Sequence, residues 1–224
     1  KVVITHGNGP QAGSLLIQQE HAETLVPGQP LDICDAMTQG QIGYMLQNRL
    51  WYHLQHYCKR VIPVCTVITQ VEVDAHSEGF RRPTKPIGPF HTQREAEELI
   101  ETHGYRMANV APHLAKGWRR VVASPRPLAI VEAQSILQLL DNHVVVIACG
   151  GGGIPVVRED SGLLRGVEAV IDKDWTAGVL AQLVDADYMM ILTDVEKVSL
   201  NWGKRNERTL DQMTVAQARR YHQR

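Results

Sequence analysis

Several features that usually reveal what a protein does are missing from this 224-residue chain. No apolar run approaches the roughly 18 residues of a transmembrane helix, so we expect no membrane span. The net charge of −1 argues against holding nucleic acid or a membrane surface through bulk charge. The four cysteines form no CxxC pair and no tight Cys/His cluster, so we predict that the protein itself holds no metal. Free thiols are usual in the cytoplasm, and we expect a cytoplasmic protein.

The common signatures of nucleotide-dependent enzymes are absent as well. The chain has no GxxxxGK[ST] phosphate loop and neither the HRD nor the DFG signature of protein kinases. It also has no internal repeat and no low-complexity tract. A phosphate-binding site in this protein must therefore be built without a Walker A loop.

The chain does contain a repeated alternation of short apolar runs and amphipathic stretches. The apolar runs predict strands at residues 2–5, 61–71, 121–123, 144–148 and 188–192. The amphipathic stretches predict helices at 10–24, from a cap at Asp32 to about residue 50, at 92–104, 132–140, 174–184 and 214–224. Capping boxes open the helices at Thr92 and Thr214. This alternation predicts an α/β domain with a mostly parallel sheet.

The stretch 72–91 breaks this alternation. It holds three prolines, two glycines and several charges, and it is too polar for a core. We expect a long loop or a small excursion from the edge of the sheet. Loops of this length in compact domains are usually functional or disordered.

Two glycine-rich segments each follow a predicted strand. Gly7, Asn8 and Gly9 lie directly before a helix, where free N–H groups and the helix dipole suit an anion. A tight turn without a ligand is the alternative, and a dinucleotide fingerprint lacks its acidic residue here. The second segment holds four glycines, including Gly151 and Gly152, and such a run indicates close approach to a ligand.

Charged residues stand near these segments at predicted element ends. Asp172, Lys173 and Asp174 begin a helix that Asp174 can cap, and a solvated charge cluster is the alternative. Lys85 stands between Pro83 and Pro86, where a plain surface loop is equally compatible. Thr193 and Asp194 follow the run at 188–192, at the strand end where α/β sheets bind ligands. Together these residues predict a phosphate-handling site, with lysines that neutralise a transferring phosphoryl group.

Six segments in order resemble those of carbamate kinases, members of the amino-acid-kinase superfamily: residues 6–11, 36–44, 83–90, 117–125, 149–157 and 167–174. The resemblance covers residues 1–224 as one domain. It implies a homodimeric three-layer α/β/α sandwich with a mostly parallel central sheet and a small protruding subdomain, with residues 72–91 part of this lid. The implied reaction is ATP + carbamate ⇌ ADP + carbamoyl phosphate, usually run toward ATP, as in arginine deiminase-type catabolism.

The resemblance also implies a role for each site residue. Lys173 bridges the phosphates, Asp174 orients the lysines of the site, and Lys85 reaches over the substrate from the subdomain. The substrate side comprises Gly7, Asn8, Gly9, Gly151 and Gly152. The nucleotide side comprises Asp172, Thr193, Asp194, Val195 and Lys204. Mg²⁺ arrives with the ATP or ADP.

The chain also departs from the family pattern. Carbamate kinases begin with a strand and a Gly-Gly-Asn loop and carry a Gly-Ser-Met-x-Pro-Lys segment after the last helix present here. We therefore expect a domain that is incomplete at both ends and that turns over poorly alone. Residues 196–199 differ from the more common Asp-Gly-Val-Tyr. The alternatives are another amino-acid kinase with a drifted substrate, or an inactive remnant that binds nucleotide or carbamoyl phosphate.

Overall fold

The computed structural model describes residues 1–222 and has a mixed α/β fold. It divides into two compact units, Lys1–Ala186 and the residues from Asp187 onward, and each is described by itself. Among the described residues, no helix is both long and apolar enough to cross a membrane. The last two residues of the helix predicted at 214–224 lie outside the described part.

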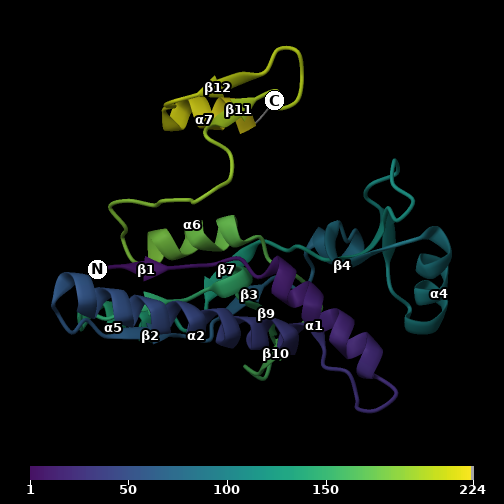
Figure 1. The fold of residues 1–224 in the computed structure, drawn as a ribbon, viewed down its shortest axis with the longest axis horizontal. Helices are drawn as coiled ribbons and strands as arrows, with labels where there is room; N and C mark the ends of the chain where they lie inside the picture. Colours follow the sequence, from purple (N-terminus) through teal and green to yellow (C-terminus); the bar gives the residue numbers. More distant parts are fainter. Residues whose placement is uncertain (223–224) are drawn as a thin grey trace. The chain divides into compact units, whose positions relative to one another are not determined.

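The first unit holds most of the predicted elements, together with several short strands that the sequence pattern did not reveal (Figure 1). Its helices are α1 (Gly9–Ala22), α2 (Leu31–Cys58), α3 (Glu78–Arg81), α4 (Gln93–His103), α5 (Ala133–Asp141), the 3₁₀ turn η1 (Gly150–Gly152) and α6 (Lys173–Leu183). Its strands are β1 (Val3–Ile4), β2 (Val64–Thr66), β3 (Gln70–Val73), β4 (Lys85–His91), β5 (Met107–Asn109), β6 (Trp118–Val122), β7 (Pro127–Ile130), β8 (Val145–Ile147), β9 (Ile154–Arg158) and β10 (Leu164–Gly166).

These strands form three small sheets, only one of which is parallel throughout. The parallel sheet has the order β1-β8-β2. In the sheet β10-β9-β3-β7 only β3 and β9 run parallel, and the sheet β4-β6-β5 is antiparallel. The prediction of a mostly parallel sheet is therefore right for the first sheet and wrong for the others. One reason is the tight turn at Gly162 (φ 88°), which joins β9 to β10 and leaves room only for antiparallel pairing.

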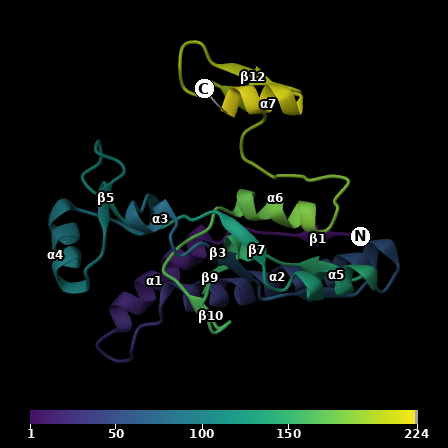
Figure 2. The same ribbon diagram turned by 180° about the vertical axis from the view of Figure 1, so that it is seen from behind.

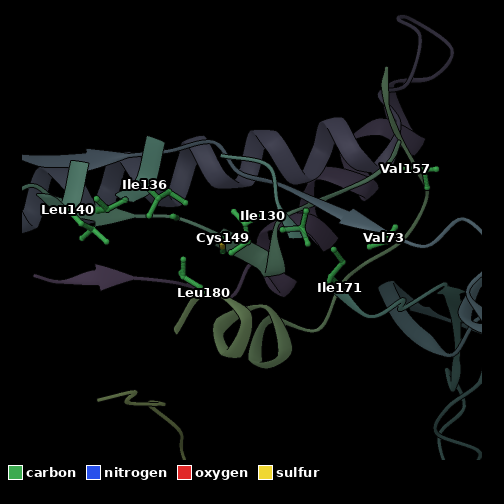
Figure 3. Close-up of a cluster of buried hydrophobic side chains, with 11 residues drawn as sticks. Val73, Ile130, Ile136, Leu140, Cys149, Val157, Ile171 and Leu180 are labelled. Atoms are coloured by element: carbon green, nitrogen blue, oxygen red, sulfur yellow. The ribbon is translucent and has the colours of Figure 1, made fainter. Parts of the chain in front are cut away.

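Two clusters of buried side chains hold the first unit together. The larger draws on β3, β7, α5, β9 and α6, and Figure 3 shows Val73, Ile130, Ile136 and Leu180 among its members. Ile136 and Leu140 of α5 and Leu180 of α6 share this cluster, whereas α2, which lies on the opposite side of β1 from α6 in Figures 1 and 2, adds no residue to it. The smaller cluster joins Leu16 of α1 and Leu31 of α2 to Ile87 of β4 and Val122 of β6. It thereby anchors the antiparallel sheet on the first two helices.

The predicted helices are confirmed within residues 1–222, and the capping box at Thr92 is complete. The Thr92 hydroxyl accepts from the Glu95 N–H at 3.2 Å, and the Glu95 carboxylate accepts from the Thr92 N–H at 2.6 Å. Gly104 ends this helix in the left-handed conformation (φ 66°). Asp32, however, does not cap α2. Pro30 takes the N-cap position with an extended backbone, so Asp32 falls in the first turn, where it still faces the positive end of the dipole.

The strand predicted at 61–71 is two strands, β2 and β3, separated at residues 67–69. Between them, the Thr69 N–H is bonded by the side chain of Gln39 from α2 and not by a strand, while the Thr69 carbonyl still accepts from the Ile154 N–H of β9. The Gln39 Oε1 accepts from the Thr69 N–H at 2.7 Å, and the Gln39 Nε2 donates to the Thr69 carbonyl at 3.1 Å and to the Gly150 carbonyl at 3.0 Å.

The prediction of a strand at residues 188–192 is wrong. This run belongs to the second unit, has no strand geometry, and exposes Tyr188, Met190 and Leu192. Apolar character alone does not make a strand, since its backbone groups need a neighbouring strand as partner, and the described residues supply none here. The second unit consists of the hairpin β11 (Val198–Leu200) and β12 (Arg208–Leu210) and the helix α7 (Val215–His222). Its capping box at Thr214 and Gln217 is present.

The stretch 72–91, expected as a loop or excursion, holds the end of β3, the short helix α3 and all of β4. Its proline-rich part is ordered because β4 pairs with β6, with Lys85 opposite Val122. The structure therefore places Lys85 at the first residue of a strand.

We predict that Gln39→Leu lowers the free energy of unfolding by about 2–4 kcal/mol, because it removes three buried hydrogen bonds and leaves the Thr69 N–H without its acceptor. Urea unfolding of the purified chain measures this loss. Gln41→Leu on the same helix is the control, since Gln41 is exposed and its loss should cost under about 0.5 kcal/mol. Equal losses in the two variants would contradict the role given to Gln39.

Candidate active site

A cavity of about 660 Å³ lies in the first unit, where the loop after β1, the start of α1, the β4–β6 pair and the start of α6 meet. Every predicted site residue of this unit lines it, apart from Gly152: Gly7, Asn8, Gly9, Lys85, Gly151, Asp172, Lys173 and Asp174. The sequence therefore identified residues that are far apart in the chain and adjacent in space.

The first glycine loop runs from the end of β1 into α1. The Gly151 N–H donates to the His6 carbonyl at 2.8 Å, which ties this loop to the second glycine segment. Pro10 stands in the first turn of α1, where its missing N–H costs nothing. The stem of Lys173 passes beside Gly7, with its Cδ 3.5 Å from the place a β-carbon would take. The loop thus offers backbone N–H groups at a helix start, with a lysine passing beside it.

Asn8 is buried and held by α2. Its Nδ2 donates to Asp35 Oδ1 at 3.1 Å and to Thr38 Oγ1 at 3.0 Å. The Thr38 hydroxyl in turn donates to the Asp35 carbonyl at 2.7 Å. The side chain of Asn8 is therefore fixed by two residues one helical turn apart.

Asp35 is one of two charged cavity residues that sequence reasoning missed. It lines the cavity and is only 4% exposed. Burial raises the pKa of its carboxyl to about 7, against the lowering effect of the Asn8 hydrogen bond and with a further rise from the charge of Asp32. Helical spacing could have indicated that Asp35 is buried, because Leu31, Asp35 and Thr38 lie on the same buried face of α2.

The second glycine segment is shaped by close contacts within the protein. Cys149, Gly151, Gly152 and Gly153 all have positive φ values. A β-carbon on Gly151 would overlap the amide of Asn8, and one on Gly152 would overlap the carbonyl of Ile171. Glycine is needed at both positions, at Gly151 beside the cavity and at Gly152 behind it. Burial raises the pKa of the Cys149 thiol to about 12, so this thiol stays protonated.

Two lysine–aspartate pairs stand at the start of α6. Lys173 Nζ donates to Asp174 Oδ1 at 2.7 Å, and Lys85 Nζ donates to Asp172 Oδ2 at 3.3 Å. The helix cap is Asp172, whose Oδ1 accepts from the Asp174 N–H at 2.9 Å. The expectation that Asp174 caps this helix is therefore wrong, because the helix begins one residue earlier than predicted.

Asp172 keeps its negative charge at the cavity wall. Burial by itself would raise the pKa of this carboxyl. The Asp174 N–H and the ammonium groups of Lys85 and Lys173 outweigh burial, so the pKa lies below its usual value. Asp172 thus links the sheet that carries Lys85 to the helix that carries Lys173.

Arg119 of β6 is a third cation of the cavity, and sequence reasoning gave it no role. Its Nε and Nη2 both donate to the Gly88 carbonyl, at 3.1 and 2.8 Å, which fixes the turn inside β4 where Gly88 has φ 66°.

Four predicted nucleotide-side residues, Thr193, Asp194, Val195 and Lys204, belong to the second unit. Thr193 Oγ1 accepts from the Val195 N–H at 3.4 Å, and the Lys204 N–H donates to the Asn201 carbonyl at 3.0 Å. All four are exposed within that unit.

The cavity is chemically suited to an anion with several oxygen atoms. Lys85, Lys173 and Arg119 place three cationic groups around it, and the start of α1 adds backbone N–H donors. Both lysines are held by carboxylates yet remain more than a third exposed, so each ammonium can reach a ligand without being buried alone.

Comparison with known proteins places this chain in a family. Residues 1–223 match the model of the amino acid kinase family. The chain is 48% identical to carbamate kinase 1 of Enterococcus faecium, covering all of this chain and 70% of that protein. It is 49% identical to the carbamate kinase-like protein YqeA of Escherichia coli (strain K12), covering 99% of this chain and 70% of that protein.

Solved structures agree with these relatives. The carbamate kinase from Giardia lamblia bound to AMP-PNP matches with a TM-score of 0.88 and 41% identity, over 100% of this chain and 69% of that one. The chain thus spans about 70% of the length of these relatives. With a family match along nearly its whole length and relatives close to half identical, the chain belongs to the amino acid kinase family and, within it, to the carbamate kinases.

Proposed function

We propose that the protein is a phosphotransferase that interconverts ATP + carbamate and ADP + carbamoyl phosphate, and that it runs in the ATP-forming direction in arginine deiminase-type catabolism. The observation that carries the reaction is the cavity itself, where two lysine–aspartate pairs face a glycine loop at a helix start. Family membership supports the same reaction, and the E. faecium and G. lamblia relatives are carbamate kinases.

The proposed step needs charge balance more than acid–base chemistry. Toward ATP, a β-phosphate oxygen of ADP attacks the phosphorus of carbamoyl phosphate, and the bond from phosphorus to the carbamate oxygen breaks. The transferring group carries negative charge between two anionic oxygens. Lys173 and Lys85 neutralise this charge as it moves, while Asp174 and Asp172 hold the two ammonium groups in place.

We propose that Gly7, Asn8, Gly9, Gly151 and Gly152 form the carbamate side of the site. Asp172 belongs to the ATP or ADP side in this proposal. The other residues expected on that side, Thr193, Asp194, Val195 and Lys204, lie in the second unit. A relative crystallised with AMP-PNP supports nucleotide binding by this family. In this proposal Mg²⁺ arrives bound to the phosphates of the nucleotide. The cavity carboxylates Asp172 and Asp174 are paired with lysines and are therefore not offered as ligands of the ion.

We propose that the three-layer architecture of the family is present, with α5 and α6 on one side of the strands and α2 on the other. The core cluster that α5 and α6 share without α2 supports this, and Figure 1 shows α6 and α2 on opposite sides of β1. In the proposal residues 72–91 contribute β4 to a protruding lid that carries Lys85. The antiparallel sheet that β4 forms with β6 and β5, separate from the sheets of the core, supports a separate subdomain.

We propose that the protein is a cytoplasmic homodimer that pairs through α2. Ile33, Met37, Tyr44 and Trp51 are exposed, and their spacing puts them on one face of that helix. An exposed apolar stripe of this kind marks an interaction surface. The free cysteines fit a reducing compartment.

The reaction is tested by measuring ATP formed from carbamoyl phosphate and ADP by the product of the complete reading frame. Carbamate, N-acetylglutamate, glutamate and UMP are then compared as acceptors with ATP as the donor. Preference for carbamate supports the proposal. Preference for another acceptor would identify a kinase with a drifted substrate, and nucleotide binding without turnover would identify an inactive remnant.

We predict that Lys173→Ala lowers turnover by roughly 10²–10³ with little change in nucleotide affinity, because it removes a charge that stabilises the transition state. Asp174→Asn should also lower turnover by misplacing the ammonium. The double variant should lose clearly less than the product of the two losses. Lys116→Ala, which breaks the exposed Lys116–Glu95 pair, is the control and should leave turnover unchanged. Losses that multiply would show that Lys173 and Asp174 do not work as a unit.

We predict that Lys85→Ala lowers turnover while the free energy of unfolding changes by under about 1 kcal/mol. The Lys85–Asp172 pair is partly exposed, and such pairs contribute little stability. Steady-state kinetics and urea unfolding of the same preparation measure the two effects. A large loss of stability at unchanged turnover would instead make Lys85 a structural residue of β4.

A further inference from the structure

We infer that Asp35 is a positioning residue that takes up a proton when an anion binds in the cavity. The inference rests on the proposed function, because it assumes that the cavity receives an oxyanion such as a phosphoryl group. It assigns a role to a buried carboxyl that the proposed reaction does not use.

The hydrogen bonding of Asn8 depends on the charge of Asp35. An ionised carboxylate only accepts hydrogen bonds, so Asn8 must present its NH₂ group to Asp35. Asp35 and Thr38 together occupy both donors of that group. The oxygen of the Asn8 amide then accepts no hydrogen bond from residues 1–222. Because this oxygen is only an acceptor, it cannot bind an anion. Once Asp35 is protonated its O–H can donate to that oxygen, and the amide can turn its NH₂ group away to serve the ligand.

The net charge around the cavity also depends on Asp35. Three cationic side chains and three carboxyl groups line the cavity. Their net charge is zero when all six are ionised and +1 when Asp35 is neutral. Asp32 and the Cys34 thiol lie near Asp35 on its own helix, and the charged groups that line the same cavity are Lys85 of β4, Arg119 of β6, and Asp172, Lys173 and Asp174 at the start of α6. No lysine or arginine lies within ion-pair distance of Asp35 among the described residues, whereas Asp172 is paired with Lys85. The charged form of Asp35 is therefore stabilised less by ion pairing than the charged forms of the other cavity carboxylates.

The direction of the effect follows from the linkage between charge and binding. Burial raises the pKa of Asp35 to about 7, and a bound anion raises it further by repulsion. Anion affinity is therefore greatest where Asp35 is already neutral, below about pH 7. Above that pH each bound anion must also bring a proton, and affinity falls by up to about tenfold per pH unit.

The test is isothermal titration of the 224-residue chain with sulfate, a dianion that does not itself titrate near neutral pH. We expect the dissociation constant to rise by up to about tenfold between about pH 7 and about pH 8. Buffers with different ionisation enthalpies should reveal uptake of up to one proton per sulfate. Asp35→Asn, which keeps the shape and stays neutral, should bind sulfate equally well at both pH values. Asp32→Asn is the control, and it should keep the pH dependence with its midpoint moved to lower pH, because Asp32 raises the pKa of Asp35.

A second measurement needs no ligand. A folded-state pKa above the unfolded value means that stability is fully present below the unfolded pKa, near 4, and is lost as pH rises through about 7. The unfolding equilibrium constant of the wild-type chain should therefore grow relative to that of Asp35→Asn over this window, by up to about tenfold per pH unit.

The outcomes separate this inference from the proposed function. Sulfate binding that is equally tight at about pH 7 and about pH 8, or an Asp35→Asn variant that keeps the wild-type pH dependence, overturns the coupling and leaves the anion site intact. A constant stability ratio between the two chains also overturns it, since Asp35 would then be ionised throughout. Absence of sulfate binding at every pH, in both chains, overturns the anion site together with the coupling.

Discussion

Three buried polar side chains within little more than one turn of α2 hold the two glycine loops against each other. Asp35 and Thr38 bind the amide of Asn8, and Gln39 binds the carbonyl of Gly150 and both backbone groups of Thr69. Burial makes each of these bonds expensive to lose, so the network specifies one arrangement of the loops. The ends of β1 and β8 thereby meet at a fixed distance, and the cavity lies beside this junction.

The charges at the cavity depend on a second junction, at Asp172. This residue caps α6 through one carboxylate oxygen and receives Lys85 through the other. The antiparallel sheet and α6 are therefore connected through a group that also sets the electrostatics of the site. Lys173, one residue later, is held by Asp174. Two lysines can then face one ligand, each with its own carboxylate, which limits their mutual repulsion before the ligand binds.

Much of this site could be predicted from sequence, and the parts that could not have physical reasons. The glycine loops and residues 172–174 indicate a binding site from local sequence alone. Runs of glycine lose much conformational entropy on folding, and clustered charges at the start of a helix suit a charged ligand. Asp35 gives no such local indication, because a single carboxylate in a helix is usually exposed to solvent. Only the tertiary fold shows that Asp35 is buried. The division of residues 61–71 into two strands escaped notice because the Thr69 N–H between them is bonded by Gln39, distant in sequence, and not by a strand. The run at 188–192 has the composition of a buried strand, but composition says nothing about whether a partner strand is available.

The central claim is that the loop after β1, the glycine turn at Gly151 and the start of α6 form one anion-binding site. Titration of the ¹⁵N-labelled chain with inorganic phosphate, followed by the backbone amide signals, tests this most directly. The account predicts saturable shifts that share one dissociation constant at Gly7, Asn8, Gly9, Gly151 and Lys173, with the signals of the exposed α4 unmoved. Shifts that do not saturate, or that appear at α4 as strongly as at these loops, would contradict it.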